Sequence, residues 1–182
     1  MVTGSVGCML HGEPRATYDI GIVIDPTPEQ RSAMLEALDR DWIVFADAAR
    51  EALRNRSMFN VINQAGAEKV DFIIRRDREY SKMEFSRRVS ATLLGTEISV
   101  VSPEDSILSK LEWAKKGDSE RQFRDAVGVA VTQTGRLDFD YMRRWAGTLG
   151  LSDELSRLLR RTSEMGEDRG GGTPHDAGNP KL

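Results

Sequence analysis

The sequence predicts an α+β protein, with a mixed sheet flanked by helices in residues 1–101 and a helical subdomain in residues 102–162. Two observations predict this division. Before Val101, short runs of β-branched residues are bounded by turn residues and are not separated by regular helices, which disfavours a doubly wound parallel sheet. After Ser102 and Pro103, apolar residues recur every three or four positions, the spacing of amphipathic helices.

The predicted elements follow from local patterns of the same kind. Residues 2–5 are expected to be the end of a strand that runs into a turn. Strands are expected over residues 19–25, 42–45, 59–62, 69–74, 89–94 and 97–101, with hairpins joining the last two pairs. Helices are expected over residues 5–10, 27–38, 46–54, 80–87, 102–117, 118–132, 138–147 and 152–162. Residues 163–182 are rich in Gly, Pro, Asp and Asn, and we expect them to form a disordered tail.

Composition narrows the class of protein. The 182 residues are 39% hydrophobic, enough for one compact core and a small second lobe. A charged fraction of 30% with a net charge of -3 suits a soluble protein and disfavours a dedicated nucleic-acid binder. No apolar run approaches the roughly 20 residues that span a membrane, and from the first residues we expect no secretory signal. Cys8 is the only cysteine, which excludes an intrachain disulfide, so we expect a cytoplasmic protein without a membrane partner.

We expect the stretch from Gly4 to Asp25 to hold the residues that decide the function. Gly4 allows a ligand to approach the backbone closely, and a helix starting at Ser5 would direct free N–H groups at a phosphate. Alternate strand residues share a face about 6.8 Å apart, so carboxylates spaced in this way converge on divalent cations. Asp71, inside the strand 69–74, is placed to add a carboxylate from a neighbouring strand. Cations held in this way bridge nucleotide phosphates in an in-line displacement.

These residues resemble the signature of the nucleotidyltransferase superfamily, in which a Gly-Ser pair precedes Asp-x-Asp by about a dozen residues. The pair is Gly4-Ser5, and the second element is Asp19-Ile20-Gly21, preceded by Arg15-Ala16-Thr17-Tyr18. The blocks 57–73, 102–113 and 120–125 resemble the remainder of the abortive-infection toxin type and its bacterial relatives. The resemblance therefore covers about residues 1–160 and implies a nucleotidyltransferase-like fold.

The resemblance also implies an activity and its residues. Asp19 and Asp71 would be the catalytic, metal-binding carboxylates for Mg²⁺ or Mn²⁺. The nucleoside triphosphate (NTP) would be held by five residues, namely Gly4, Ser5, Arg15, Thr17 and Lys110. The reaction would move a nucleoside monophosphate to RNA such as tRNA, to a protein hydroxyl or to a small molecule. A toxin–antitoxin setting would add a cognate antitoxin as partner.

One position departs from the signature. Gly21 stands where the second carboxylate of Asp-x-Asp is expected, and Asp25 lies about 13 Å further along the strand at ~3.4 Å per residue. Losing one anionic ligand weakens the binding of at least one cation. The alternative hypothesis is therefore a catalytically degraded protein that keeps the fold for nucleotide binding or for interaction.

Purely structural roles remain open for several of these residues. Asp19 has the alternative of capping the turn before its strand. Asp71, which is costly to bury unpaired, has the alternative of a salt bridge to Arg15 or Lys69. Lys110 has the alternative of extending its ammonium to solvent from an apolar helix face.

Other polar residues are expected to be ordinary surface features. His11 is expected in a loop rather than on a phosphate, and Arg121 with Asp125 as a helix pair rather than a catalytic pair. The basic pair Arg160-Arg161 is expected to be a solvated face rather than a phosphate track.

Overall fold

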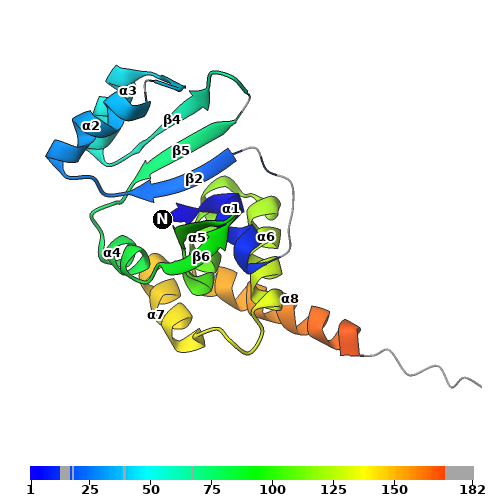
Figure 1. The fold of residues 1–182 in the computed structure, drawn as a ribbon. Coiled ribbons are helices and arrows are strands. Elements are labelled where there is room, and N and C mark those ends of the chain that lie inside the picture. The colour runs from blue at the N-terminus through cyan, green and yellow to red at the C-terminus, as the bar shows by residue number, and fades with distance from the viewer. Residues whose placement is uncertain (13–16, 18, 39, 67, 171–182) are drawn as a thin grey trace, which may run out of the picture.

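A seven-stranded mixed sheet forms the centre of the computed structural model, which describes residues 1–12, 17, 19–38, 40–66 and 68–170 (Figure 1). The spatial order is β3-β4-β5-β2-β1-β7-β6. β2 pairs parallel with β5, and β1 pairs antiparallel with β2 and parallel with β7, so the mixed sheet expected from the sequence is confirmed. The strands are β1 (Val2–Thr3), β2 (Asp19–Ile24), β3 (Trp42–Val44), β4 (Met58–Asn63), β5 (Lys69–Ile74), β6 (Val89–Leu93) and β7 (Thr96–Val100).

Two helices cover one face of the sheet. α2 (Pro28–Leu38) and α3 (Ala46–Asn55) pack over β3, β4 and β5 (Figure 1). The core on this side joins α3 to alternate residues of the strands, and its fully or nearly buried members are Ala49, Ala52, Leu53, Phe59, Val61, Val70 and Ile74. Because side chains alternate across a strand, Lys69, Asp71 and Ile73 lie on the opposite face of β5.

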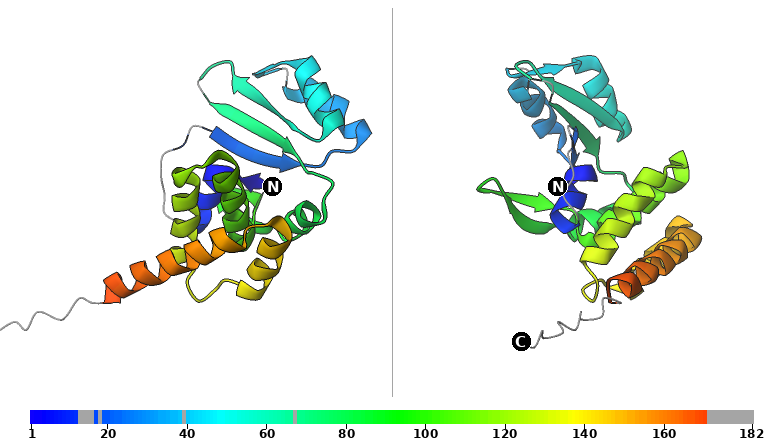
Figure 2. Two further views of the ribbon diagram at one scale, coloured as in Figure 1. Left: turned by 180° about the vertical axis from the view of Figure 1, so that it is seen from behind. Right: turned by 90° about the vertical axis from the view of Figure 1, so that its right-hand side faces the viewer.

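The helical half and α1 share a second core. It comprises α5 (Pro103–Gly117), α6 (Glu120–Thr132), α7 (Phe139–Leu149) and α8 (Ser152–Gly170), and α1 (Gly4–His11) joins them through Cys8. Figure 2 shows α8 at the end of the molecule away from α2 and α3. Local chemistry sets the start of α5, because the side chain of Ser102 accepts a hydrogen bond from the Asp105 N–H. The remaining helix is α4 (Glu79–Ser86).

Most element boundaries differ from the sequence prediction by one or two residues, and the end of α8 differs by eight. α8 continues to Gly170 instead of ending at Thr162, and Met165, in the added part of the helix, packs against the helical core. The predicted tail overlaps this helix in residues 163–170, and residues 171–182 lie outside the described part of the chain. β3 ends at Val44 because Phe45 is the N-cap residue of α3. No helix in the described part of the chain is long and apolar enough to cross a membrane.

Candidate functional site

The sheet register brings the two predicted carboxylates together. In the parallel β2–β5 pair, Asp19 lies opposite Lys69 and Gly21 lies opposite Asp71. Thr3 of β1 pairs with Gly21 on its other side. Paired residues of adjacent strands project to the same face, about 4.8 Å apart. Asp71, Gly21 and Thr3 therefore form a row across the sheet, with Asp19 and Lys69 in the next row of the same face.

Lys69 lies between the two carboxylates. Its Nζ is 3.4 Å from Asp19 Oδ1 and 3.4 Å from Asp71 Oδ1. The Asp19 side chain is 62% exposed, whereas that of Asp71 is 20% exposed. Among the described residues Asp71 Oδ1 is buried without a hydrogen bond of good geometry, so its interaction with Lys69 is ionic. Desolvation, the largest single influence, lowers the pKa of Lys69, but Asp71 and Asp19 together outweigh it and raise that pKa above its usual value.

The position of the missing carboxylate has room for a side chain. A Cβ at Gly21 would meet Thr3 Cγ2 at 3.4 Å and Thr3 O at 3.6 Å, which is ordinary van der Waals contact. Asp25 does not replace the lost carboxylate, because it accepts ionic hydrogen bonds from Arg56 at 3.0 Å and from Arg75 at 2.6 Å. Desolvation opposes these two arginines, which hold the pKa of Asp25 below its usual range.

The residues present do not fit a two-metal centre. Within the described ranges, no group of three or more His, Cys, Asp or Glu side chains is placed to hold a metal ion. Asp19 and Asp71 are two carboxylates with an ammonium between them. Two divalent cations require more anionic ligands than this pair supplies.

The start of α1 borders the same row. Gly4, the first residue of α1, has φ +65°, a conformation that glycine adopts without strain. A Cβ at Gly4 would contact no described atom within 4 Å, so open space adjoins the backbone there. Thr3 is the N-cap residue but makes no side-chain cap bond. The N-terminus of α1, with Gly4 and Ser5, therefore begins directly beside the Asp71–Gly21–Thr3 row.

The remaining predicted nucleotide-binding residues have different surroundings. The hydroxyl of Thr17 lies 3.4 Å from Asp19 N and 3.3 Å from Asp19 O, which makes a local turn before β2. Arg15 lies outside the described residues. Lys110 is buried, and its Nζ donates to Gln122 Oε1 at 2.6 Å and to Asp125 Oδ2 at 2.9 Å. Lys110 thus joins α5 to α6 instead of extending to solvent.

His11 and Asn60 differ from what the sequence predicts. His11 is the last residue of α1 and not a loop residue; its Nε2 lies 2.6 Å from the Val101 carbonyl oxygen. Asn60 was not predicted, yet it pairs with Asp71 across β4 and β5 and extends the polar row. Its signal in the sequence was weak, because the register of β4 against β5 decides whether Asn60 or a neighbour meets Asp71.

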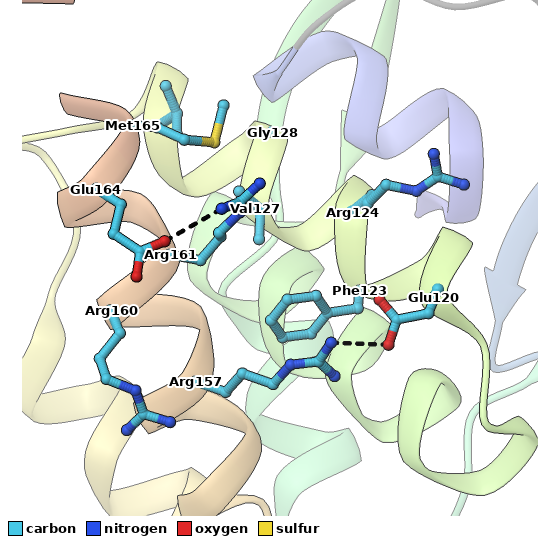
Figure 3. Close-up of a pocket in the computed structure, with 11 residues that line it drawn as sticks. Glu120, Phe123, Arg124, Val127, Gly128, Arg157, Arg160, Arg161, Glu164 and Met165 are labelled. Atoms are coloured by element: carbon cyan, nitrogen blue, oxygen red, sulfur yellow. Dashed lines mark hydrogen bonds and ion pairs between the residues drawn. The ribbon is translucent and has the colours of Figure 1, made fainter. Parts of the chain in front are cut away.

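A cavity of about 610 Å³ lies elsewhere, between α6 and α8 (Figure 3). Arg157 lies over the Phe123 ring at 4.0 Å from its centroid and donates to Glu120 Oε1 at 2.7 Å. Arg161 donates to Glu164 at 3.1 Å. This cavity contains none of the predicted site residues, and two of its arginines are already engaged by carboxylates.

Comparison with known structures supports the fold. The chain is similar to the crystal structure of an antigenic nucleotidyltransferase-like protein from Paracoccidioides brasiliensis, with a TM-score of 0.55 over 91% of this chain and 81% of that chain. The sequence identity is 15%, so the likeness concerns the fold alone. No protein-family profile and no curated protein sequence matches the chain. The chain has a nucleotidyltransferase-like fold.

Proposed function

We propose that the protein binds the phosphates of a nucleoside triphosphate beside the Asp71–Gly21–Thr3 row and does not catalyse two-metal nucleotidyl transfer. The observation that carries the proposal is the composition of this face of β2 and β5. It holds two carboxylates, a glycine in the place of a third, and an ammonium 3.4 Å from both carboxylates. Such a face lacks the anionic charge that two divalent cations require.

The N-terminus of α1, Gly4 and Lys69 support the proposal of phosphate binding. The N-terminus of α1 presents N–H groups of its first turn, and the partial positive charge there favours an anion. Gly4 adds open space at this end of the helix, and Lys69 adds a cation on the adjoining strand face. These features favour a ligand rich in phosphate oxygens, such as an NTP.

A second candidate function is metal-dependent nucleotidyl transfer with Mg²⁺ or Mn²⁺. One observation favours it: the buried Asp71 Oδ1, which accepts no hydrogen bond from the described residues, is an oxygen of the kind that coordinates a cation. On this proposal the acceptor is RNA such as tRNA, a protein hydroxyl or a small molecule. A toxin role with a cognate antitoxin belongs to the same candidate.

Two measurements on the purified chain separate the candidates. Calorimetric titration with each of the four NTPs measures binding, and incubation with α-³²P-labelled NTPs, Mg²⁺ or Mn²⁺, bulk tRNA and cell extract measures transfer. We expect binding without transfer. Transfer by the natural chain would support the second candidate, and an absence of binding to all four NTPs would reject the first.

The variant Gly21→Asp tests the role of the missing carboxylate. The contacts at Gly21 accommodate a Cβ, and residue 21 lies directly beside Asp71. We expect this variant to bind Mn²⁺ more tightly than the natural chain. The matched control is Gly147→Asp on α7, which adds the same charge where a Cβ meets no described atom within 4 Å. Equal Mn²⁺ affinity in the two variants would show that position 21 is not part of a cation site.

A further inference from the structure

Lys69 occupies a defined position relative to both carboxylates. Its Nζ is equidistant, at 3.4 Å, from one oxygen of Asp19 and one oxygen of Asp71. The side chain of Lys69 is 35% exposed, so its stem lies partly against the sheet. The ammonium is therefore close to the place at which a cation shared by these two oxygens would lie.

The backbone explains why Lys69 reaches this place. Lys69 and Asp71 are two residues apart on β5 and share a face, while the parallel register sets Asp19 directly beside Lys69. If the pairing of β5 slipped by one residue, Lys69 and Asp71 would move to the opposite face of the sheet, which packs against α3. The arrangement is thus fixed by strand pairing and not by the choice of a surface rotamer alone.

The positive charge of Lys69 affects the binding of both metal ions and phosphates at this site. Mg²⁺ binds carboxylate oxygens at about 2.0–2.1 Å, so it would compete with the ammonium for the same two oxygens. The lysine reduces the charge of the pair from -2 to -1 without a metal. That reduction also lowers the repulsion that two bare carboxylates would exert on the phosphates of a nucleotide near Gly4.

We infer that Lys69 is the specificity-determining residue of this site: its ammonium acts as a built-in cation that weakens divalent-metal binding and makes nucleotide binding independent of Mg²⁺. The part that concerns nucleotide rests on the proposed function above, whereas the part that concerns metal does not. Lys69 takes part in no bond-breaking step in this account.

The first experiment measures metal alone. Free Mn²⁺ is followed by electron paramagnetic resonance while it is titrated with the natural chain, Lys69→Met and Lys69→Arg. Removing both partly exposed ion pairs should tighten Mn²⁺ binding about tenfold, which corresponds to about 1.4 kcal/mol. Lys69→Arg keeps the charge and should bind Mn²⁺ as weakly as the natural chain.

Lys82→Met is the matched control. Lys82 also lies between two carboxylates, at 3.0 Å from Asp77 and 3.4 Å from Glu79, but outside the sheet face. Those carboxylates are 65% and 85% exposed, and removing their lysine should leave Mn²⁺ affinity within about twofold of the natural chain. Circular dichroism confirms that each variant is folded before it is titrated.

The second experiment measures NTP affinity with EDTA and with Mg²⁺. The natural chain should show less than about a twofold difference, whereas Lys69→Met should bind about tenfold more weakly in EDTA and recover in Mg²⁺. Equal Mn²⁺ affinity in the natural chain and Lys69→Met would overturn the inference, as would NTP binding to the natural chain that requires Mg²⁺. If no variant binds NTP but Lys69→Met still tightens Mn²⁺ binding, the metal part of the inference stands and the proposed function falls.

Discussion

Glu84 is a buried carboxyl group whose titration should change the free energy of unfolding of the protein. It lies on α4 with 8% of its surface exposed, and Ser109 of α5 donates a hydrogen bond of 2.7 Å to its Oε1. Burial is the main cause that raises the pKa of Glu84 from 4.5 to about 7, with a smaller contribution from nearby Asp105, while the Ser109 bond opposes it. We predict that Glu84→Gln stabilises the protein above pH 7.

The magnitude follows from proton linkage. Between about pH 4.5 and 7 the folded state keeps a proton on Glu84 that the unfolded state has released, so stability falls as the pH rises through this window. A difference of about 2.5 pH units at ~1.36 kcal/mol per unit sets an upper limit of about 3 kcal/mol. Glutamine keeps an oxygen that accepts the Ser109 hydrogen bond, and it carries no charge. The free energy of unfolding of the variant therefore does not fall between about pH 4.5 and 7 for this reason.

Urea unfolding followed by circular dichroism at pH 5 and pH 8 tests the prediction. The free energy of unfolding of Glu84→Gln should exceed that of the natural chain by up to ~3 kcal/mol at pH 8 and by much less at pH 5. Glu79→Gln is the control, because Glu79 begins the same helix with an 85% exposed side chain. A gain for Glu84→Gln that is equal at both pH values, or a loss at pH 8, would refute the reasoning.

Three other substitutions test the contacts that α5 makes with α4, with α6 and with the helical core. Lys110→Met removes the buried ammonium that joins α5 to Asp125 on α6 and should lower the free energy of unfolding by about 3 kcal/mol, read from the urea midpoint. Arg78→Met breaks the two-bond pair with Glu112, at 2.8 and 2.7 Å. Because that arginine is the main cause that lowers the pKa of Glu112 to about 2, the variant should be less stable at pH 7 and should converge with the natural chain as the pH falls from about 4.5 toward 2. Leu111→Ala, at a fully buried position, should cost about 3 kcal/mol in thermal or urea unfolding. An unchanged midpoint for Lys110→Met or Leu111→Ala, or a pH-independent loss for Arg78→Met, would contradict the corresponding contact.

The local parts of the fold were predictable from the sequence. The Ser102 cap marked the change to helices, and the apolar runs of β2 and β5 predicted two strands. The order of the strands was not predictable, because the two-residue strand β1 lies between β2 and β7, which are distant in sequence. The glycine-rich composition after Ser163 led to the prediction of a disordered tail, although α8 continues to Gly170 and Met165 packs against the helical core.

The candidate site was predictable only in its individual residues. The spacing from Gly4 to Asp19 indicated two of its members, and Asp71 was expected as a carboxylate from a neighbouring strand. A salt bridge between Lys69 and Asp71 was one alternative that the sequence predicted, and the structure confirms it. The approach of Lys69 to Asp19 depends on the parallel register, which local patterns do not specify. The hydrogen bonds of Lys110 were not predictable from local patterns either, because its partners lie 12 and 15 residues away on another helix.

Gly21 and Lys69 change the charge of one sheet face in the same direction, and this makes a joint prediction. Three carboxylates on this face would carry -3; Gly21 leaves -2, and the ammonium of Lys69 leaves -1. Gly21→Asp alone or Lys69→Met alone therefore restores only one unit of negative charge. The double variant restores both, and because the two positions border the same carboxylates, their effects should be coupled instead of additive. In the Mn²⁺ titration we expect the fold-increase in affinity of the double variant to exceed the product of the fold-increases of the two single variants. Simple additivity would mean that residue 21 and Lys69 do not act on a common cation position.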